Sequence, residues 1–337
     1  MIGQRVTDSS SRWILTVGMH RSGTSAAAGT LGELGAALPR AEDRVEWRAS
    51  NPEHHESLSA TIHNERLLQA LGGAWDAPPI LRQHWAQTAS VVAGGASSAL
   101  LRAAFPVSTP AAWKDPRLCL LLPYWRMVLT GPMNALFVWR PPGAVARSLQ
   151  WRDQIPVSDA LALWERYNRM AVQNLAGMTV LVVDYDSMVD DPRGFASSCQ
   201  TWFGLGERCR EARAPIRPQL RHHSAVASPI DLSAQQQRLW SCLEEITSGH
   251  AVFPTVDLGE ETPDVEPAFE RRRPAANRRR EREAANRTYF AMRSELLETR
   301  KALRRIQAST TWRLTQPLRR VVGHLERTRR SLGIGPS

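Results

Sequence analysis

A glycine-bearing turn near the start of the chain has the composition of an anion-binding loop. It reads G-M-H-R-S-G-T-S over residues 18–25 and lies between an apolar segment, residues 13–17, and a segment of small residues, 26–38. Backbone N–H groups of such a turn, together with the positive end of a following helix, can surround a phosphate. Arg21 adds a permanent cation inside the turn. We therefore predict a phosphate-binding site here.

A second segment repeats this arrangement of strand, turn and helix. Residues 137–148 read F-V-W-R-P-P-G-A-V-A-R-S, which puts Arg140 at the end of an apolar strand and Ser148 inside the next helix. One phosphate can accept hydrogen bonds from both side chains. Two anion sites at the carboxyl ends of two strands suit a mononucleotide that is phosphorylated at two separate positions.

The two segments resemble the donor-binding motifs of sulfotransferases that use 3′-phosphoadenosine 5′-phosphosulfate (PAPS). Residues 21–25 are similar to the family's 5′-phosphosulfate loop, and Arg140 with Ser148 is similar to its 3′-phosphate motif. Residues 183–192, which contain Tyr185 and an Asp-Pro pair, resemble the Y-E-D-L…D-P segment whose tyrosine contacts adenine.

Two further segments resemble the bacterial branch of this family. W-K-D-P-R at residues 113–117 is similar to its K-D-P-R element, and I-R-P-Q-L-R-H at 216–222 is similar to its I-D-P-x-L-R-H segment. The resemblance extends over about residues 13–225 and preserves the family's order of motifs.

The resemblance implies in-line transfer of a sulfuryl group from PAPS to an acceptor oxygen or nitrogen, which leaves 3′-phosphoadenosine 5′-phosphate (PAP). Arg21 would stabilise the charge on the departing oxygen. No metal is expected. The residues expected to bind the donor are Arg21, Ser22, Gly23, Thr24, Ser25, Arg140, Ser148, Tyr185 and Arg221.

An acceptor hydroxyl also needs a base. N-P-E-H-H-E at residues 51–56 resembles the family's N-P-x-G-x-x-E element, although the glycine is missing and the spacing is one residue shorter. This departure leaves open which of Glu53, His54, His55 and Glu56 faces the site. We favour Glu56 as the base and His55 next; Asp115 is a further candidate, and Lys114 a second cation. Two simpler interpretations stay open: Glu56 as a solvated residue at a helix start, and Lys114 to Arg117 as a local ion-paired turn.

The elements that must position these residues alternate between strands and helices. This pattern predicts a P-loop-like, three-layer α/β fold with a central, mostly parallel sheet. The expected strands are 13–17, 134–139 and 179–183, and the expected helices are 26–38, 58–71, 144–151, 159–174 and one from 191 to about 204.

The bulk composition sets limits on the class of protein. The chain has 337 residues, of which 42% are hydrophobic and 23% charged, as in soluble globular proteins. No apolar run reaches the roughly 18 residues of a membrane span, and the polar start does not read as a signal peptide, so we expect a cytoplasmic location. The four cysteines form no C-x-x-C pair, which argues against a zinc site or a disulfide framework.

The positive charge is concentrated in the C-terminal part of the chain. From Arg271 onward there are 19 Lys and Arg residues against 5 Glu, whereas residues 1–270 carry a small negative excess. We predict a sulfotransferase domain over 1–250, a linker over 251–280 and a basic helical tail over 281–337. A heptad seam in that tail predicts a coiled-coil appendage and a homodimer; its members are Ala285, Tyr289, Met292, Leu296, Thr299, Leu303 and Ile306.

The end of the tail suggests a class of acceptor. S-T-T-W-R-L-T-Q-P-L-R at residues 309–319 resembles a tail element that follows coiled coils in bacterial glycan-synthesis enzymes. This resemblance implies a carbohydrate or glycolipid acceptor. A tryptophan among arginines also suits peripheral contact with an anionic membrane, here the inner face. No nucleic-acid recognition motif accompanies the charge, so no nucleic-acid partner is expected.

Two other functions remain as alternatives. A nucleotide or small-molecule kinase needs a lysine in the first loop, where this chain has Thr24. A scaffold with a degenerate nucleotide site would keep the loop without catalysis, and substitution of Arg21 would then leave its function unchanged.

Overall fold

The computed structural model describes residues 13–44, 55–106, 110–206 and 230–283. The chain divides into one compact unit over 1–274, which contains the central sheet, and a second over 275–337, in which residues 275–283 are helical. The predicted donor residue Arg221, the coiled-coil seam and the 309–319 element lie outside the described residues.

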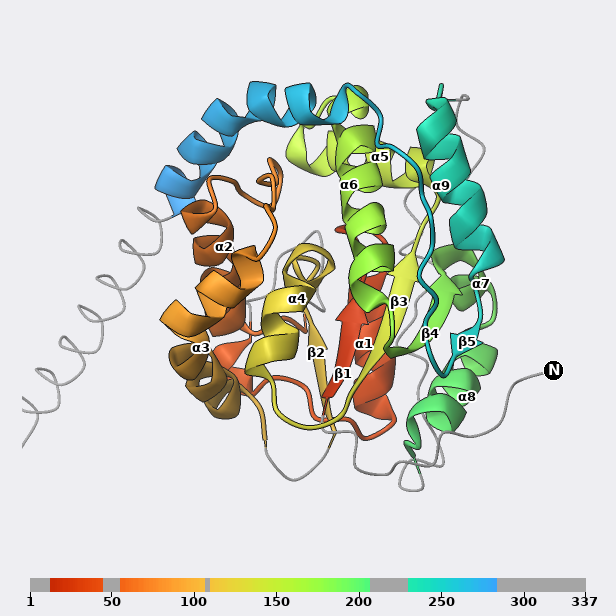
Figure 1. Cartoon of the computed structure of the whole chain (residues 1–337). Coiled ribbons are helices and arrows are strands. Elements are labelled where there is room, and N and C mark those ends of the chain that lie inside the picture. The colour runs from red at the N-terminus through yellow and green to blue at the C-terminus, as the bar shows by residue number, and fades with distance from the viewer. Residues whose placement is uncertain (1–12, 45–54, 107–109, 207–229, 284–337) are drawn as a thin grey trace, which may run out of the picture. The chain divides into compact units, whose positions relative to one another are not determined.

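The first unit alternates strands and helices (Figure 1). The strands are β1 (Trp13–Val17), β2 (Ala111–Lys114), β3 (Met133–Trp139), β4 (Thr179–Asp184) and β5 (Gly249–His250). The helices are α1 (Thr24–Glu33), the short 3₁₀ helix η1 (Ala41–Asp43), α2 (Leu58–Ala70), α3 (Trp85–Ala104), α4 (Leu118–Val128), α5 (Pro142–Asp153), α6 (Val157–Leu175), α7 (Tyr185–Asp190), α8 (Pro192–Phe203) and α9 (Ala234–Glu245). A further helix begins at residue 265.

The sheet has the strand order β2-β1-β3-β4-β5. The first four strands are parallel, and β5 is antiparallel to β4. All five residues of β1 are buried, as expected for a strand covered on both faces. The predicted α/β fold with a mostly parallel central sheet is therefore confirmed. The sequence did not indicate β2 or β5, because β2 is short and alanine-rich and β5 has only two residues.

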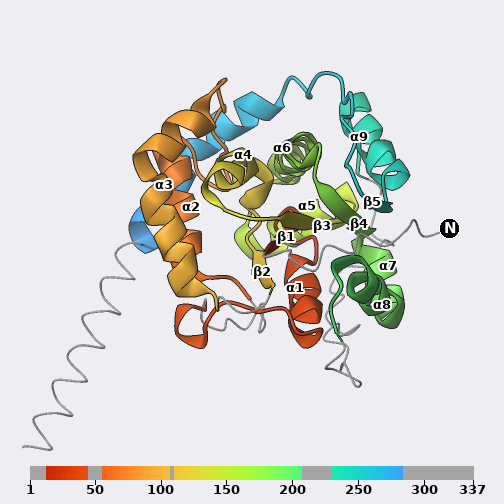
Figure 2. The same ribbon diagram turned by 60° about the horizontal axis from the view of Figure 1, so that its bottom comes forward.

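Helices cover both faces of the sheet, which gives three layers (Figure 2). α1 and α8 pack on one face, and α4 and α6 on the other. On the α1 and α8 face, Ile14, Leu136 and Val138 of the sheet contribute to one buried cluster with Leu31 and Phe195. No helix in the described part of the chain is both long and apolar enough to cross a membrane.

The strand order fixes where a ligand can bind. β1 pairs with β2 on one side and with β3 on the other, so the order reverses at β1. In open α/β sheets, ligands bind beyond the carboxyl ends of the strands at such a reversal. The turn after β1 and the segment after β3 meet at this point, and both contain residues predicted to bind phosphate.

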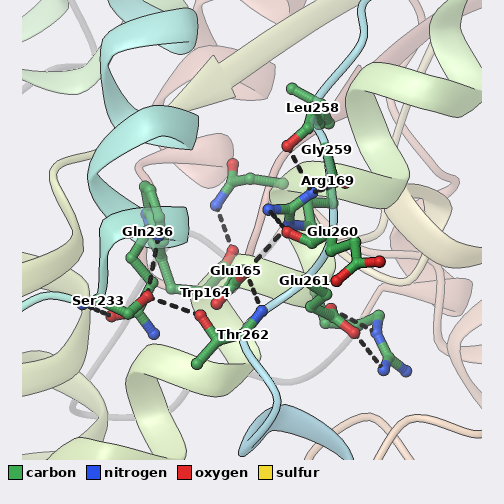
Figure 3. A network of polar contacts seen from close by, with 12 residues as sticks. Trp164, Glu165, Arg169, Ser233, Gln236, Leu258, Gly259, Glu260, Glu261 and Thr262 are labelled. Carbon is green, nitrogen blue, oxygen red and sulfur yellow. Dashed lines mark hydrogen bonds and ion pairs between the residues drawn. The ribbon is translucent and has the colours of Figure 1, made fainter.

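Residues 251–274 do not form the linker that their composition predicted. Residues 258–260 accept hydrogen bonds from the buried Arg169 of α6 through their carbonyl groups, over 2.6–3.1 Å. Thr262 donates its backbone N–H to Glu165, which also pairs with Arg169 at 3.0 Å (Figure 3). Backbone groups of this segment therefore satisfy the buried side chains of Glu165 and Arg169, and residues 251–274 belong to the first unit.

Substitution of Arg169 should destabilise the unit strongly. Glu165 is fully buried, so Arg169→Met would leave its carboxylate without a counter-ion and release the three carbonyl groups. Removing one partner of a buried ion pair lowers the free energy of unfolding by about 3–5 kcal/mol, and urea denaturation can measure this loss. Arg102→Met, at an exposed arginine of α3, is the control and should change the free energy of unfolding little. Equal stabilities of the two variants would contradict this role of the network.

Candidate functional site

The turn after β1 has the backbone of an anion-binding loop. Arg21 and Gly23 both have left-handed backbone conformations, with φ of 71° and 88°, and the Ser22 N–H donates to the Met19 carbonyl at 3.1 Å. Gly23 is the N-cap of α1 and offers no side chain to cap it. The first backbone N–H groups of α1 are therefore suited to an anionic ligand.

The two predicted phosphate sites are in direct contact. The Nε of Arg21 donates to Oγ of Ser148 on α5 at 2.8 Å, and Nη1 of Arg140 donates to the Arg21 carbonyl at 3.2 Å. The Arg140 carbonyl in turn accepts from the indole Nε1 of Trp164 on α6 at 2.9 Å. One site is thus formed by the loop after β1, the end of β3 and the start of α5. The helix α6 contacts this site through the hydrogen bond from Trp164.

Tyr185 joins the site from the end of β4. The guanidinium carbon of Arg140 lies 4.1 Å from the centroid of the Tyr185 ring, a cation–π contact. Asp184 caps α7 by accepting from the Ser187 N–H at 2.8 Å, which places Tyr185 at the start of that helix. Gly23 lies against the same ring, since a Cβ on Gly23 would be 2.4 Å from Cδ2 of Tyr185. The predicted residues Arg21, Gly23, Arg140, Ser148 and Tyr185 therefore come together.

The site has an excess of positive charge. Burial, the largest cause, and the nearby Arg152 and Arg140 together lower the pKa of Arg21 to about 10, while Asp153 opposes them. Arg21 is still protonated at neutral pH. Arg152 was not predicted from the sequence, yet it follows Ser148 by four residues on α5 and so shares its helix face. That spacing is the signal that would have identified it.

Ser22 supplies a polar group that the described residues leave unsatisfied. Its side chain is fully buried, and its Oγ has no hydrogen-bond partner among the described residues. Thr24 is buried beside it, and Ser25 is half-buried. A buried hydroxyl without a partner is costly, so a phosphate entering this loop would stabilise it. The loop therefore fits the donor-binding role predicted for residues 21–25.

Glu56 and Lys114 form an ion pair. Lys114 is the last residue of β2, in register with Thr16 of β1, so it lies at the same edge of the sheet as the phosphate-binding turn. Its side chain is almost fully buried, and that of Glu56 is 13% exposed. Glu56 is therefore not a solvated residue at a helix start. His55 precedes it with a left-handed φ of 44°, and Ser57 caps α2 by accepting from the Ala60 N–H.

Asp115 lies in a buried ion-paired turn. Its Oδ1 accepts from the backbone N–H and from Nη1 of Arg117, at 2.9 and 3.1 Å, and its Oδ2 accepts from Asn64 of α2 at 2.9 Å. Burial raises the pKa of Asp115, against the opposing charge of Arg117. Arg117 also bonds Glu65 of α2 at 2.9 Å. This geometry favours the interpretation as an ion-paired turn over a role for Asp115 as a base.

Two tryptophans contact residues at or next to the site. Trp125 is fully buried and donates to Asn64 at 2.9 Å, whereas Trp75 packs on His20 of the phosphate-binding turn. Among the residues that the structure describes, no group of three or more His, Cys, Asp or Glu side chains is arranged to hold a metal ion.

Two sulfotransferase domains are among the solved structures to which the chain is similar. The chain is similar to a sulfotransferase domain from the olefin synthase of Synechococcus PCC 7002, with 15% identity and a TM-score of 0.43 over 72% of this chain and 98% of that one. It is also similar to a sulfotransferase domain from the curacin biosynthetic pathway, with 14% identity and a TM-score of 0.41 over 69% and 97% of the two chains. No protein-family model and no curated protein matches the chain. Likenesses at this level carry no argument about activity, which therefore depends on the site itself.

Substitution of Gly23 tests the close approach of the loop to Tyr185. Gly23→Ala should lower the free energy of unfolding by about 1–3 kcal/mol more than Gly35→Ala, because the added Cβ would clash with the ring. Gly35 is a matched control: its φ is also positive, at 95°, but nothing lies within 4 Å of a Cβ there. Both variants share the backbone cost, so the difference isolates the clash. Equal losses in urea denaturation would show that the loop does not contact Tyr185.

Proposed function

We propose that this protein is a sulfotransferase that moves a sulfuryl group from PAPS to a hydroxyl or amine of an acceptor. The observation that carries the proposal is the cluster in which Arg21 bonds Ser148, while Arg140 bonds the Arg21 carbonyl and stacks on Tyr185. It combines the two anion sites and the adenine contact that the sequence predicted separately.

The donor would be held at its two anionic ends. Arg140 and Ser148 would bind the 3′-phosphate, and Tyr185 would contact the adenine. Arg21 and the loop residues Ser22 to Ser25 would bind the 5′-phosphosulfate through backbone N–H groups, hydroxyls and the guanidinium. The donor's negative charges would offset the repulsion among the arginines of the site, which supports a multiply charged ligand over a neutral one.

The transfer itself forms one bond and breaks another. The acceptor oxygen or nitrogen attacks the sulfur, the bond from sulfur to the bridging phosphate oxygen breaks, and PAP departs with that electron pair. Arg21 stabilises the developing negative charge, as cationic groups do in phosphoryl transfer. The acceptor's proton passes to the carboxylate of Glu56, with His55 as the second candidate. Lys114 would hold Glu56 in place.

The acceptor and its setting belong to the same proposal. The resemblance of residues 309–319 to tails of glycan-synthesis enzymes supports a carbohydrate or glycolipid acceptor. The basic C-terminal part supports peripheral contact with the anionic inner face of a membrane, and the heptad seam supports a homodimer.

Removal of the Arg140 guanidinium should weaken donor binding strongly. In calorimetry the full chain should bind PAP more tightly than ATP, and Arg140→Ala should weaken PAP binding about 100-fold, because a charge-assisted phosphate contact is lost. Arg102→Ala, at an exposed arginine outside the site, should bind PAP like the unmodified protein. If the folded protein binds no PAP, the proposal fails, and preferential ATP binding would favour the kinase.

Substitution of Glu56 should separate catalysis from donor binding. Glu56→Gln keeps the shape of the side chain but removes the base, so kcat should fall about 100-fold or more while the PAP affinity stays unchanged. Turnover is measured as PAP release from PAPS with a bacterial glycolipid extract as acceptor. Glu33→Gln, at the exposed end of α1, should turn over normally. Normal turnover by Glu56→Gln would remove Glu56 from the mechanism.

A further inference from the structure

His20 of the phosphate-binding turn packs against Trp75, which lies far from it in the sequence. The ring of His20, the residue before Arg21, lies 4.4 Å from the centroid of Trp75 and 5.6 Å from that of Tyr167 on α6. Trp75 belongs to the segment after α2 and is only 8% exposed. The position of the Trp75 ring therefore limits where His20, and with it the turn, can lie.

The segment around Trp75 is itself held by hydrogen bonds from two other elements. The Tyr167 hydroxyl donates to the Trp75 carbonyl at 2.7 Å. Arg272 donates from Nε to the Asp76 carbonyl at 2.9 Å and from Nη2 to the Asp76 carboxylate at 3.2 Å. This two-pronged contact uses the planar fork of the guanidinium, which a lysine cannot reproduce.

Arg272 also contacts the helix that supports the donor site. Its Nη1 lies 3.7 Å from a carboxylate oxygen of Asp159, in the first turn of α6. The same helix holds the Arg140 carbonyl through Trp164. Asp76 and Asp159 are 4% and 7% exposed, so both carboxylates lie in a buried setting where the loss of a cation is costly.

We propose that Arg272 is a positioning residue for the phosphate-binding turn. It acts through Asp76 and Trp75, whose ring fixes His20 and thereby the backbone that carries Arg21. Arg272 lies beyond the sulfotransferase domain predicted from the sequence, so a chain shortened before this residue would lack part of the support of its donor site. The effect on donor affinity rests on the proposed function, whereas the contact with His20 does not.

Two measurements on the full chain test the contact with His20 and the effect on donor affinity separately. The first is the ring-proton resonance of His20 in histidine-labelled protein, assigned with His20→Gln. Its chemical shift is displaced by the ring current of Trp75, whose ring centroid lies 4.4 Å from that of His20. The second is the PAP dissociation constant. Arg272→Met should move the His20 resonance and weaken PAP binding about tenfold, as misplacement of a binding group does.

Matched variants make the test specific. Arg271→Met removes the neighbouring arginine, which is 52% exposed and contacts Asp159 and Asp264 at 3.5 and 4.0 Å; it should leave both measurements unchanged. Arg272→Lys keeps the charge and serves if Arg272→Met does not fold, with a smaller change in the same direction.

The outcomes distinguish this inference from the proposed function. If Arg272→Met and Arg272→Lys leave the His20 resonance in place, or move it without weakening PAP binding, Arg272 is not a positioning residue. If the unmodified protein binds no PAP while the His20 resonance still responds to Arg272, the sulfotransferase proposal has failed and the contact chain from Arg272 to His20 stands.

Discussion

Repulsion among arginines at the carboxyl edge of the sheet is the constraint that governs this site. Arg21 is largely buried, and Arg140 and Arg152 both act to lower its pKa. The protein offsets this charge only in part, through Asp153 and the ring of Tyr185. Such an arrangement costs stability unless a ligand supplies negative charge. The proposed donor, an anion that would contact more than one of these cations, would relieve this repulsion.

α6 is the element that holds the site together from one face of the sheet. Trp164 bonds the carbonyl of Arg140, Tyr167 bonds the carbonyl of Trp75, and Asp159 pairs with Arg272. Further towards the C-terminal end of α6, Arg169 donates a hydrogen bond to the carbonyl of Leu258. One helix thus connects the donor site to residues more than 90 positions away in the sequence. Composition alone could not reveal contacts between residues so far apart in the sequence, so it did not place residues 251–274 with the domain predicted over 1–250.

The sequence predicted the parts of the site that depend on local pattern. The turn after β1, the strand that ends before Arg140 and the position of Ser148 follow from apolar runs and glycine-bearing turns, and the structure has all three. It did not predict Asn64 or Arg272, because their roles come from tertiary contacts that leave no local signature. The composition of residues 251–280 suggested a linker, yet the carbonyl groups of residues 258–260 accept hydrogen bonds from the buried Arg169. A charged segment can thus be part of a folded unit when the charges opposite it are buried.

Thermal unfolding with matched nucleotides tests the central claim most directly. A ligand that binds only the folded protein raises the midpoint of unfolding, and at equal concentrations the tighter ligand raises it more. At equal concentrations PAP should raise the midpoint more than AMP, which lacks the 3′-phosphate, and adenosine should have no effect. That order would show that the arginine cluster binds both phosphate groups of one nucleotide. Equal shifts with PAP and AMP, or none with either, would contradict the account.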